Sequence, residues 1–335
     1  MAFNFYGSNT AQSSEKKSNV NWEDLNKYIV ETANLEERET LVGYVSAIVD
    51  LGIQAQEDDE YVSDVALEDE EDFKDDNPGY YFKDGIDPST KQPARMKCRP
   101  AKDQQSIAIA IDFPDIIVDK GQFFGESNPK PLRLWMGNQF FLQNHGMVVG
   151  RPTALKWANL DKTRKTKKLS FAQNHICYKM AVASKLSKTG ECFTPPEVDK
   201  LLGEAFQFAA QVFFKEGKGG SSYYTEYVNF VGALGRGQAK PELITEPVLI
   251  GFNDKNKPEH LKEIRSHVIN TMKMAKNWEG SPIQKQLEAL YNASGSDETE
   301  EEVPEPKKEE KKPTKATKKV VEPSPEDDDS DLLPF

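Results

Sequence analysis

Cationic and aromatic side chains lie close together in the middle of this chain. Arg133 and Trp135 share one parity in "PLRLWMG", and Trp157 directly follows Lys156, ahead of the run "KTRKTKK". Cations follow the phosphates of a nucleic acid, and aromatic faces stack on its bases. The sequence therefore predicts a surface for this ligand, made by Arg133, Trp135, Arg151, Lys156, Trp157, Arg164, Lys165, Lys167, Lys168, Lys215, Lys218, Tyr223, Tyr224, Tyr227 and Arg236.

These residues also have a purely structural interpretation. Tyrosines on a strand can pack at the rim of a barrel, and "KTRKTKK" can be the solvated start of a helix. The phenylalanines of the region fit a core better than a stacking surface: Phe140, Phe141, Phe206, Phe208, Phe213, Phe214 and Phe230. We favour nucleic acid because the run lies in the segment of the chain that carries net positive charge.

The charge of the chain is unevenly distributed. The whole sequence has a formal net charge of -12, but residues 57–76 contain twelve acids and one lysine, and the tail from Ser294 to Phe335 has a net charge of -7. From Asn77 to Ala293, Lys and Arg outnumber Asp and Glu by ten. A basic body between acidic segments indicates a polyanionic partner more than the global charge does.

No catalytic set is recognisable, so we expect a non-enzymatic protein without a cofactor. The sequence lacks a Walker-type glycine loop, HExxH and a serine elbow. A nuclease remains an alternative if Asp58, Asp59 and Glu60 hold a metal, although a solvated acidic run explains them more simply. His175 and Cys177 are a weak candidate for a metal pair.

The cellular setting is inferred from what the sequence lacks. Cys98, Cys177 and Cys192 are few and far apart, which predicts no disulfide framework. The first residues, "MAFNFYGSNT", do not resemble a signal peptide, and no apolar run approaches the ~20 residues of a membrane span. We expect a soluble protein in a reducing cytoplasm.

Hydrophobic periodicity predicts the elements that must position the site. Helices are expected over 21–39, with Asn21 as the cap, over 168–190, over 257–277 and over 281–293, with a helical turn at "TPPEVDKLLG". Strands are expected at 40–56, at "QSIAIAIDFPDIIV" and at "PLRLWMG", followed by a hairpin whose runs meet at "EGKGGS". The acidic insertion 57–76 is expected to be a mobile loop, and 80–100 to be rich in turns.

The order of these elements predicts a β-rich α+β protein built on a five-stranded OB-type barrel, β-β-β-α-β-β. Its organisation would be a flexible N-terminus over 1–20, the barrel domain over 21–254, C-terminal helices over 255–293, and a disordered acidic tail over 294–335. The tail is low in apolar residues and rich in Pro, Glu and Lys, which predicts disorder.

The chain ends in "DDDSDLLPF", which resembles the acidic tip of bacterial single-stranded DNA-binding proteins. In that family aspartates precede an apolar residue and a terminal Pro-Phe; Ser330 and Leu332 depart from the usual pattern. The body, with "VSAIVDLGIQAQ" and "TEPVLIGFN", is similar to bacteriophage-encoded members. The resemblance implies that the tip binds partner proteins through Asp327, Asp328, Asp329, Asp331, Leu332, Leu333, Pro334 and Phe335.

The expected function is therefore coating of single-stranded DNA in replication, recombination and repair, and the resemblance implies the cytoplasm of a bacterial host as its location. The resemblance implies recruitment of polymerase, primase-helicase or host repair enzymes through the tip, and terminal carboxylate capture is a general recognition mode. The tail would also compete for the protein's own basic groove. A strand-annealing or mediator protein, and an interaction scaffold that binds no DNA, are the alternatives; RNA fits the same stacking and phosphate contacts as DNA.

Overall fold

A computed structural model describes residues 21–293 apart from 138–139, 143–145, 161–162, 164–166 and 217–221. Its helices and helical turns are α1 (Trp22–Ala33), η1 (Leu67–Asp69), α2 (Glu70–Asp76), α3 (Gly121–Phe124), α4 (Ile176–Ala183), η2 (Pro195–Leu201), α5 (Pro258–Leu261), α6 (Ser266–Lys273) and α7 (Pro282–Ala293). Its strands are β1 (Glu39–Gln54), β2 (Asp59–Val62), β3 (Tyr81–Ile86), β4 (Pro93–Arg99), β5 (Gln104–Asp119), β6 (Pro129–Trp135), β7 (Phe140–Leu142), β8 (Gly146–Val148), β9 (Thr153–Ala154), β10 (Trp157–Asn159), β11 (Leu169–Phe171), β12 (Ala205–Glu216), β13 (Ser222–Gly232) and β14 (Val248–Ile250).

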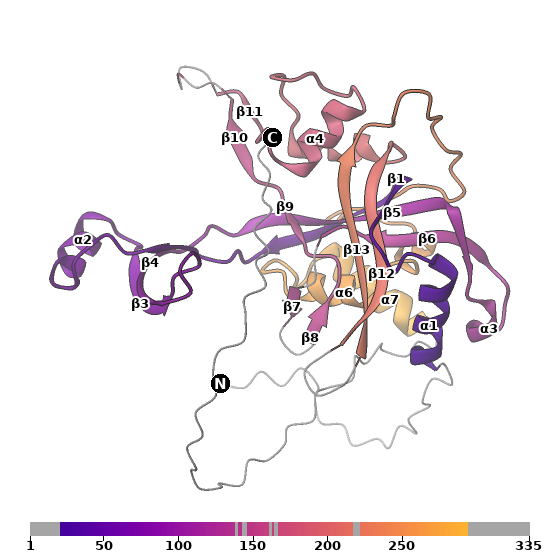
Figure 1. Ribbon diagram of the computed structural model, residues 1–335, viewed down its shortest axis with the longest axis horizontal. Helices are drawn as coiled ribbons and strands as arrows, with labels where there is room; N and C mark the ends of the chain where they lie inside the picture. Colours follow the sequence, from indigo (N-terminus) through magenta and orange to yellow (C-terminus); the bar gives the residue numbers. More distant parts are fainter. Residues whose placement is uncertain are drawn as a thin grey trace, which may run out of the picture. The chain divides into compact units, whose positions relative to one another are not determined.

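The main sheet has the strand order β13-β12-β1-β5-β6, and all of these neighbours are antiparallel (Figure 1). β14 joins β1 in parallel, and β9 joins β5. The prediction of a β-rich α+β protein is confirmed. Between the described parts of β6 and β13 there is no backbone ladder, so a closed barrel is not detected.

Side chains connect these two strands where a ladder is missing. Glu226 of β13, which is 2% exposed, accepts the backbone N–H of Trp135 on β6 at 3.2 Å. Arg265, just before α6, donates to both carboxylate oxygens of Glu226 at 3.1 Å and to the carbonyl of Arg133 at 2.8 Å. A buried ion pair therefore occupies this seam and ties the C-terminal helices to it.

Two hydrophobic cores lie on opposite faces of the sheet, as the strict alternation of β5 requires. Ile107, Ile109, Ile111 and Phe113 enter one core together with α1, α4 and the inner face of the β12–β13 hairpin. Ala108 and Ala110 face the other core, under α5, α6 and α7. The long strands at 39–54 and 104–119 and the predicted hairpin are thus confirmed, as are α1 with its Asn21 cap and the C-terminal helices.

The expectation of a mobile acidic loop at 57–76 is wrong. This segment supplies β2 and α2, and residues 81–99 supply β3 and β4, which give a three-stranded sheet in the order β2-β4-β3. Cations of the β3–β4 hairpin neutralise part of the acidic charge: Arg95 forks onto the buried Glu70 at 2.7 and 2.8 Å, Lys83 pairs with Glu60, and Lys97 pairs with Asp64. We call residues 57–99 the acidic arm.

The predicted helix over 168–190 is also partly wrong. Residues 169–171 form strand β11, and the helix α4 runs from Ile176 to Ala183, with His175 as its cap. Residues 169–171 pair with β10, and backbone pairing of this kind is invisible to helical periodicity. None of the helices in the described ranges is both long and apolar enough to cross a lipid bilayer.

Candidate nucleic-acid interface

The β10–β11 ribbon carries the exposed part of the predicted surface. Trp157, Ala158 and Asn159 pair with Phe171, Ser170 and Leu169, and Asn159 Oδ1 accepts the backbone N–H of Lys168 at 3.0 Å. Trp157 is 49% exposed and Leu169 43% exposed. Lys156, Lys167 and Lys168 are exposed on either side of them, and none of the three forms an ion pair with an acid among the described residues. We call this set the cationic ribbon.

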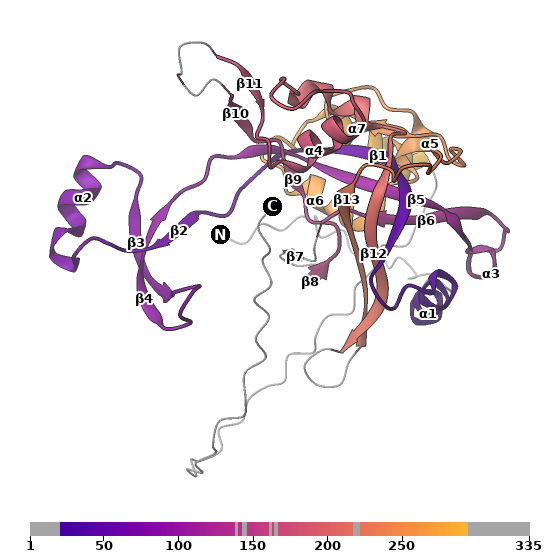
Figure 2. The ribbon, with the colours of Figure 1, turned by 45° about the horizontal axis from the view of Figure 1, so that its top comes forward.

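The root of the cationic ribbon is fixed by the core. Phe171 is fully buried and stacks on the His175 ring, with centroids 4.4 Å apart. His175 Nε2 lies 2.9 Å from the Ala154 carbonyl, and Ser170 Oγ donates to the Phe193 carbonyl at 2.9 Å. Burial lowers the pKa of His175, which favours the neutral ring. Figures 1 and 2 both show the ribbon next to α4.

The outer face of the β12–β13 hairpin holds a second group of predicted residues. Lys215 and Tyr223 lie opposite each other near the turn. Tyr227 is on the same face of β13, four residues after Tyr223 and opposite Gln211. The guanidinium of Arg38 lies 4.3 Å from the centre of the Tyr227 ring. Sequence reasoning missed Arg38, because it sits in the acidic stretch "NLEERE" and nothing local indicates that it meets a tyrosine 189 positions later.

Arg133 was predicted as a phosphate contact, but its guanidinium is committed to the protein. Its Nε and Nη2 donate to the two oxygens of Asp112 at 2.7 and 3.0 Å, and its Nη1 donates to Glu263 at 3.0 Å. Asp112 is fully buried, whereas the Arg133 side chain is 17% exposed. This correction follows from the β5–β6 register, which sets Asp112 directly opposite Arg133.

Trp135 is buried and Tyr224 is half-buried, and both rings contact other parts of the protein. Trp135 is 2% exposed and packs in the core under α6, where its ring meets His267 edge-on at 6.0 Å. Tyr224 shares the inner face of β13 with Glu226 and donates its hydroxyl to that carboxylate at 2.9 Å. Both were predicted from their closeness to cations in sequence, a signal that does not report which face of a strand is covered.

The remaining predicted residues are divided between exposed positions and undescribed ones. Arg151 is exposed and pairs with Glu57 at 2.8 Å, and Arg236 is exposed in the loop after β13. Arg164, Lys165 and Lys218 lie outside the described residues, as do Asp327, Asp328, Asp329, Asp331, Leu332, Leu333, Pro334 and Phe335. Phe206 and Phe208 belong to the core, as predicted; Phe213, Phe214 and Phe230 are half-buried.

The catalytic and metal alternatives find no cluster to support them. Asp58 accepts the Tyr81 hydroxyl at 2.6 Å, and Glu60 pairs with Lys83. His175 Nδ1 accepts the Cys177 N–H at the start of α4, which leaves neither ring nitrogen for a metal. Within the described ranges no three His, Cys, Asp or Glu side chains gather as a metal site would require.

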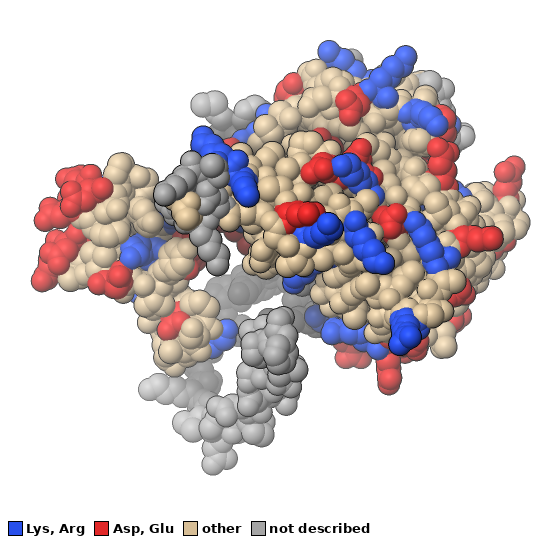
Figure 3. Space-filling view, turned by 90° about the horizontal axis from the view of Figure 1, so that it is seen from above, with Lys and Arg blue, Asp and Glu red and all other residues tan. Residues whose placement is uncertain are grey.

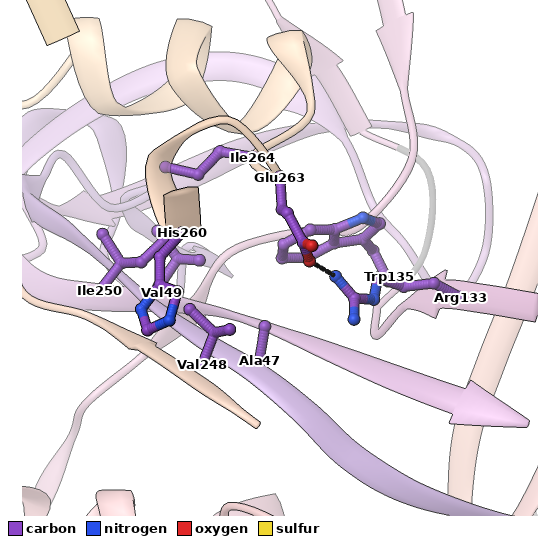
Figure 4. A pocket seen from close by; sticks show the side chains of 9 residues that line it. All are labelled: Ala47, Val49, Arg133, Trp135, Val248, Ile250, His260, Glu263 and Ile264. Atoms are coloured by element: carbon purple, nitrogen blue, oxygen red, sulfur yellow. Dashed lines mark hydrogen bonds and ion pairs between the residues drawn. The ribbon is translucent and has the colours of Figure 1, made fainter. Parts of the chain in front are cut away.

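A small pocket lies where α5 covers β1, β6 and β14 (Figure 4). Its walls are apolar, from residues such as Val49, Trp135 and Ile250, and the Arg133–Glu263 ion pair lies at one side. The cavity of about 10 Å³ has room for about one water molecule. It is therefore too small to hold a base, and α5 closes this face of β1, β6 and β14 at this point.

Comparison of this chain with models of protein families, with curated proteins and with solved structures returned no match.

Proposed function

We propose that this protein binds single-stranded DNA, coats it in replication and recombination, and recruits partner proteins through its C-terminal tip. The observation that carries the proposal is the cationic ribbon, where a half-exposed Trp157 stands among three exposed lysines on a two-stranded ribbon anchored in the core. A stacked base contributes about 1–3 kcal/mol on such an aromatic side chain, and this contribution is tolerant of sequence.

The neighbour relations of the main sheet support an OB-type architecture. In the sheet, β1 lies between β5 and β12, β6 pairs with β5, and β13 pairs with β12. In the sequence, α4 lies between the third and fourth of these five strands, β6 and β12. An OB fold binds oligonucleotides on the face of its second and third strands and with two flanking loops. In this chain the helices α5–α7 cover much of that face. We therefore place the single-stranded DNA on the cationic ribbon and on the outer face of the β12–β13 hairpin.

The hairpin face extends the same chemistry. Tyr223 and Tyr227 supply rings, and Lys215 and Arg38 supply cations beside them. An arginine over a tyrosine ring leaves its N–H groups free to meet a phosphate, and the pair is worth about 0.5–1 kcal/mol at an exposed site. The basic excess of residues 77–293 supplies the longer-range attraction.

The test is tryptophan fluorescence during titration with oligo-dT at two salt concentrations. Trp135 and Trp278 are buried, and we expect base stacking to quench Trp157. Trp157→Leu, which keeps Trp22, should remove most of the quench and weaken affinity about 5- to 150-fold. Phe124→Ala is the matched control, because Phe124 is 55% exposed at α3, at the tip of the β5–β6 hairpin.

A second protein, ending at Ala293, tests the tail. Tighter binding by the shortened chain supports competition between the tail and the DNA, and equal binding keeps the binder without the competition. If neither chain binds oligo-dT, by quenching or by retardation in a gel, the proposal is wrong. Oligo-U in place of oligo-dT measures the preference for DNA over RNA.

A further inference from the structure

The acidic arm is a folded module. Phe73 packs edge-on against Tyr80 and Phe82 at 5.5 and 5.8 Å, and Met96 and Cys98 are buried beneath the sheet. The fork from Arg95 to the buried Glu70 fixes α2 on this sheet and lowers the pKa of Glu70, so that the pair stays ionised. The side chains that point outward from the arm are therefore held in place by a small core.

The outward side of the arm is exposed, and no other described segment of the chain pairs with its edge strands. Both β2 and β3 are edge strands, and all four residues of β2 are exposed, including Tyr61 at 55% and Val62 at 46%. Leu67 is 74% exposed and Ile86 65% exposed. An exposed strand edge bordered by large apolar side chains is a docking surface unless the chain covers it.

The charge of this surface selects its occupant. The arm has fourteen Asp or Glu against six Lys or Arg, and its cations are largely used inside it. Exposed carboxylates that form no ion pair within the described residues remain on and beside α2, at Glu68, Asp69, Asp72, Asp75 and Asp76. Figure 3 shows acidic side chains gathered over the arm. DNA is repelled by this surface, and the occupant must be cationic.

The same chain carries a surface of the opposite kind. The cationic ribbon presents Lys156, Lys167 and Lys168 around the exposed apolar surfaces of Trp157 and Leu169. We propose that, without nucleic acid, the acidic arm of one copy docks on the cationic ribbon of a second copy, and that single-stranded DNA displaces it. The release by DNA rests on the proposed function; the contact between copies needs only the two described surfaces.

The arm and the ribbon also begin at the same end of the sheet. β9 pairs with Ser106 and Ile107, a few residues after the arm ends, and Glu57 at the root of the arm pairs with Arg151 just before β9. Each copy thus offers one acidic and one basic surface from one end, and a reciprocal exchange between two copies closes into a twofold dimer.

Sedimentation velocity of the full chain without DNA tests the contact. We expect a dimer at low salt that dissociates when salt rises, since exposed charges are screened. Neutralising Glu68, Asp69, Asp72, Asp75 and Asp76 to Gln or Asn should weaken self-association about tenfold or more. The matched control neutralises five exposed acids outside the arm, Glu31, Glu36, Glu126, Glu242 and Glu279, and should leave it within about twofold.

A second variant answers the objection that neutralisation unfolds the arm. β1 and β5 are paired as far as Gln54 opposite Gln104, so residues 55–103 can be replaced by Asn-Gly, a two-residue hairpin turn. This shortened chain should be monomeric and should bind oligo-dT at least as tightly as the full chain. Oligo-dT added to the full chain should dissociate the dimer.

The outcomes separate the two proposals. A full chain that is monomeric at low salt, or a dimer that survives both changes to the arm, overturns the arm contact even when oligo-dT binds. A dimer that the arm variants abolish, in a protein that never binds oligo-dT, keeps the contact and removes the proposed function. A salt-dependent change of the sedimentation coefficient that is the same at every protein concentration would place the contact between the arm and the ribbon of one copy. That outcome also overturns the proposal.

Discussion

The buried pair of Arg133 and Asp112 gives the sharpest prediction, because it separates a structural cation from a DNA-binding one. Replacing Arg133 by Met removes both hydrogen bonds, at 2.7 and 3.0 Å, from a carboxylate that is 0% exposed. Asp112 would keep the Thr245 hydroxyl, which donates to it at 2.7 Å. A charge with one neutral partner would then remain inside the protein.

The expected cost follows from that burial. Breaking one side of a buried ion pair destabilises a protein by about 3–5 kcal/mol, whereas most substitutions of exposed residues stay within about 0.5 kcal/mol. For a domain of this size each kcal/mol lowers Tm by about 2–4 °C, so Arg133→Met should lower Tm by roughly 6 to 20 °C. Lys168→Met, at an exposed site, should leave Tm almost unchanged.

Thermal unfolding followed by circular dichroism measures the change in Tm, and titration with oligo-dT well below Tm measures the change in affinity. We expect Arg133→Met to lose stability and keep its affinity, and Lys168→Met to show the reverse. The double variant Asp112→Leu, Arg133→Leu should recover much of the stability, because it leaves no buried charge unpaired. An Arg133→Met protein that melts like the parent and fails to bind oligo-dT would refute this reasoning and return Arg133 to the interface.

Three further predictions concern pH, salt and thiol chemistry. Burial lowers the pKa of His267 from 6.5 to about 4, so on acidification the unfolded chain takes up this proton before the folded chain does. Between pH 7 and pH 4 this one group should remove about 3 kcal/mol from the free energy of unfolding. Urea titrations of His267→Phe should lack this contribution, and a pH profile that matches the parent would contradict it. Lys167→Gln should reduce the slope of log K against log salt by about 0.7, and an unchanged slope would remove this lysine from the phosphate contacts. Cys192 is exposed, whereas Cys98 and Cys177 are buried, and burial raises the pKa of Cys177 to about 12. Ellman's reagent should therefore label one thiol of the folded protein quickly and the other two only on unfolding. Rapid reaction of all three thiols would contradict the packing.

The five strands of the main sheet, β1, β5, β6, β12 and β13, were predictable from the sequence, because the spacing of their apolar residues follows which side chains are buried. The run Ile107, Ile109, Ile111 and Phe113 has the two-residue period of a strand with one face in a core. Asn21 ahead of an acidic first turn marks the start of α1, and its side chain does accept the N–H groups of Glu23 and Asp24.

The arm was mispredicted because charge density alone was read as disorder. Glu70 becomes a buried residue only when Arg95, 25 positions later, folds back across the sheet. A similar limit applies to the β6–β13 seam, where Glu226 meets Arg265 and the Trp135 N–H. Partners so distant in sequence leave no local pattern that could indicate them.

The sequence by itself determined the composition of the site: cations beside aromatic side chains in a basic body, with Trp157 among its lysines. The tertiary structure decided which of these residues are available. Strand register set Arg133 opposite Asp112, the C-terminal helices covered Trp135, and the inner face of β13 took Tyr224. The reason is physical: a strand presents alternate residues to opposite faces, and only the packing of distant segments decides which face is covered.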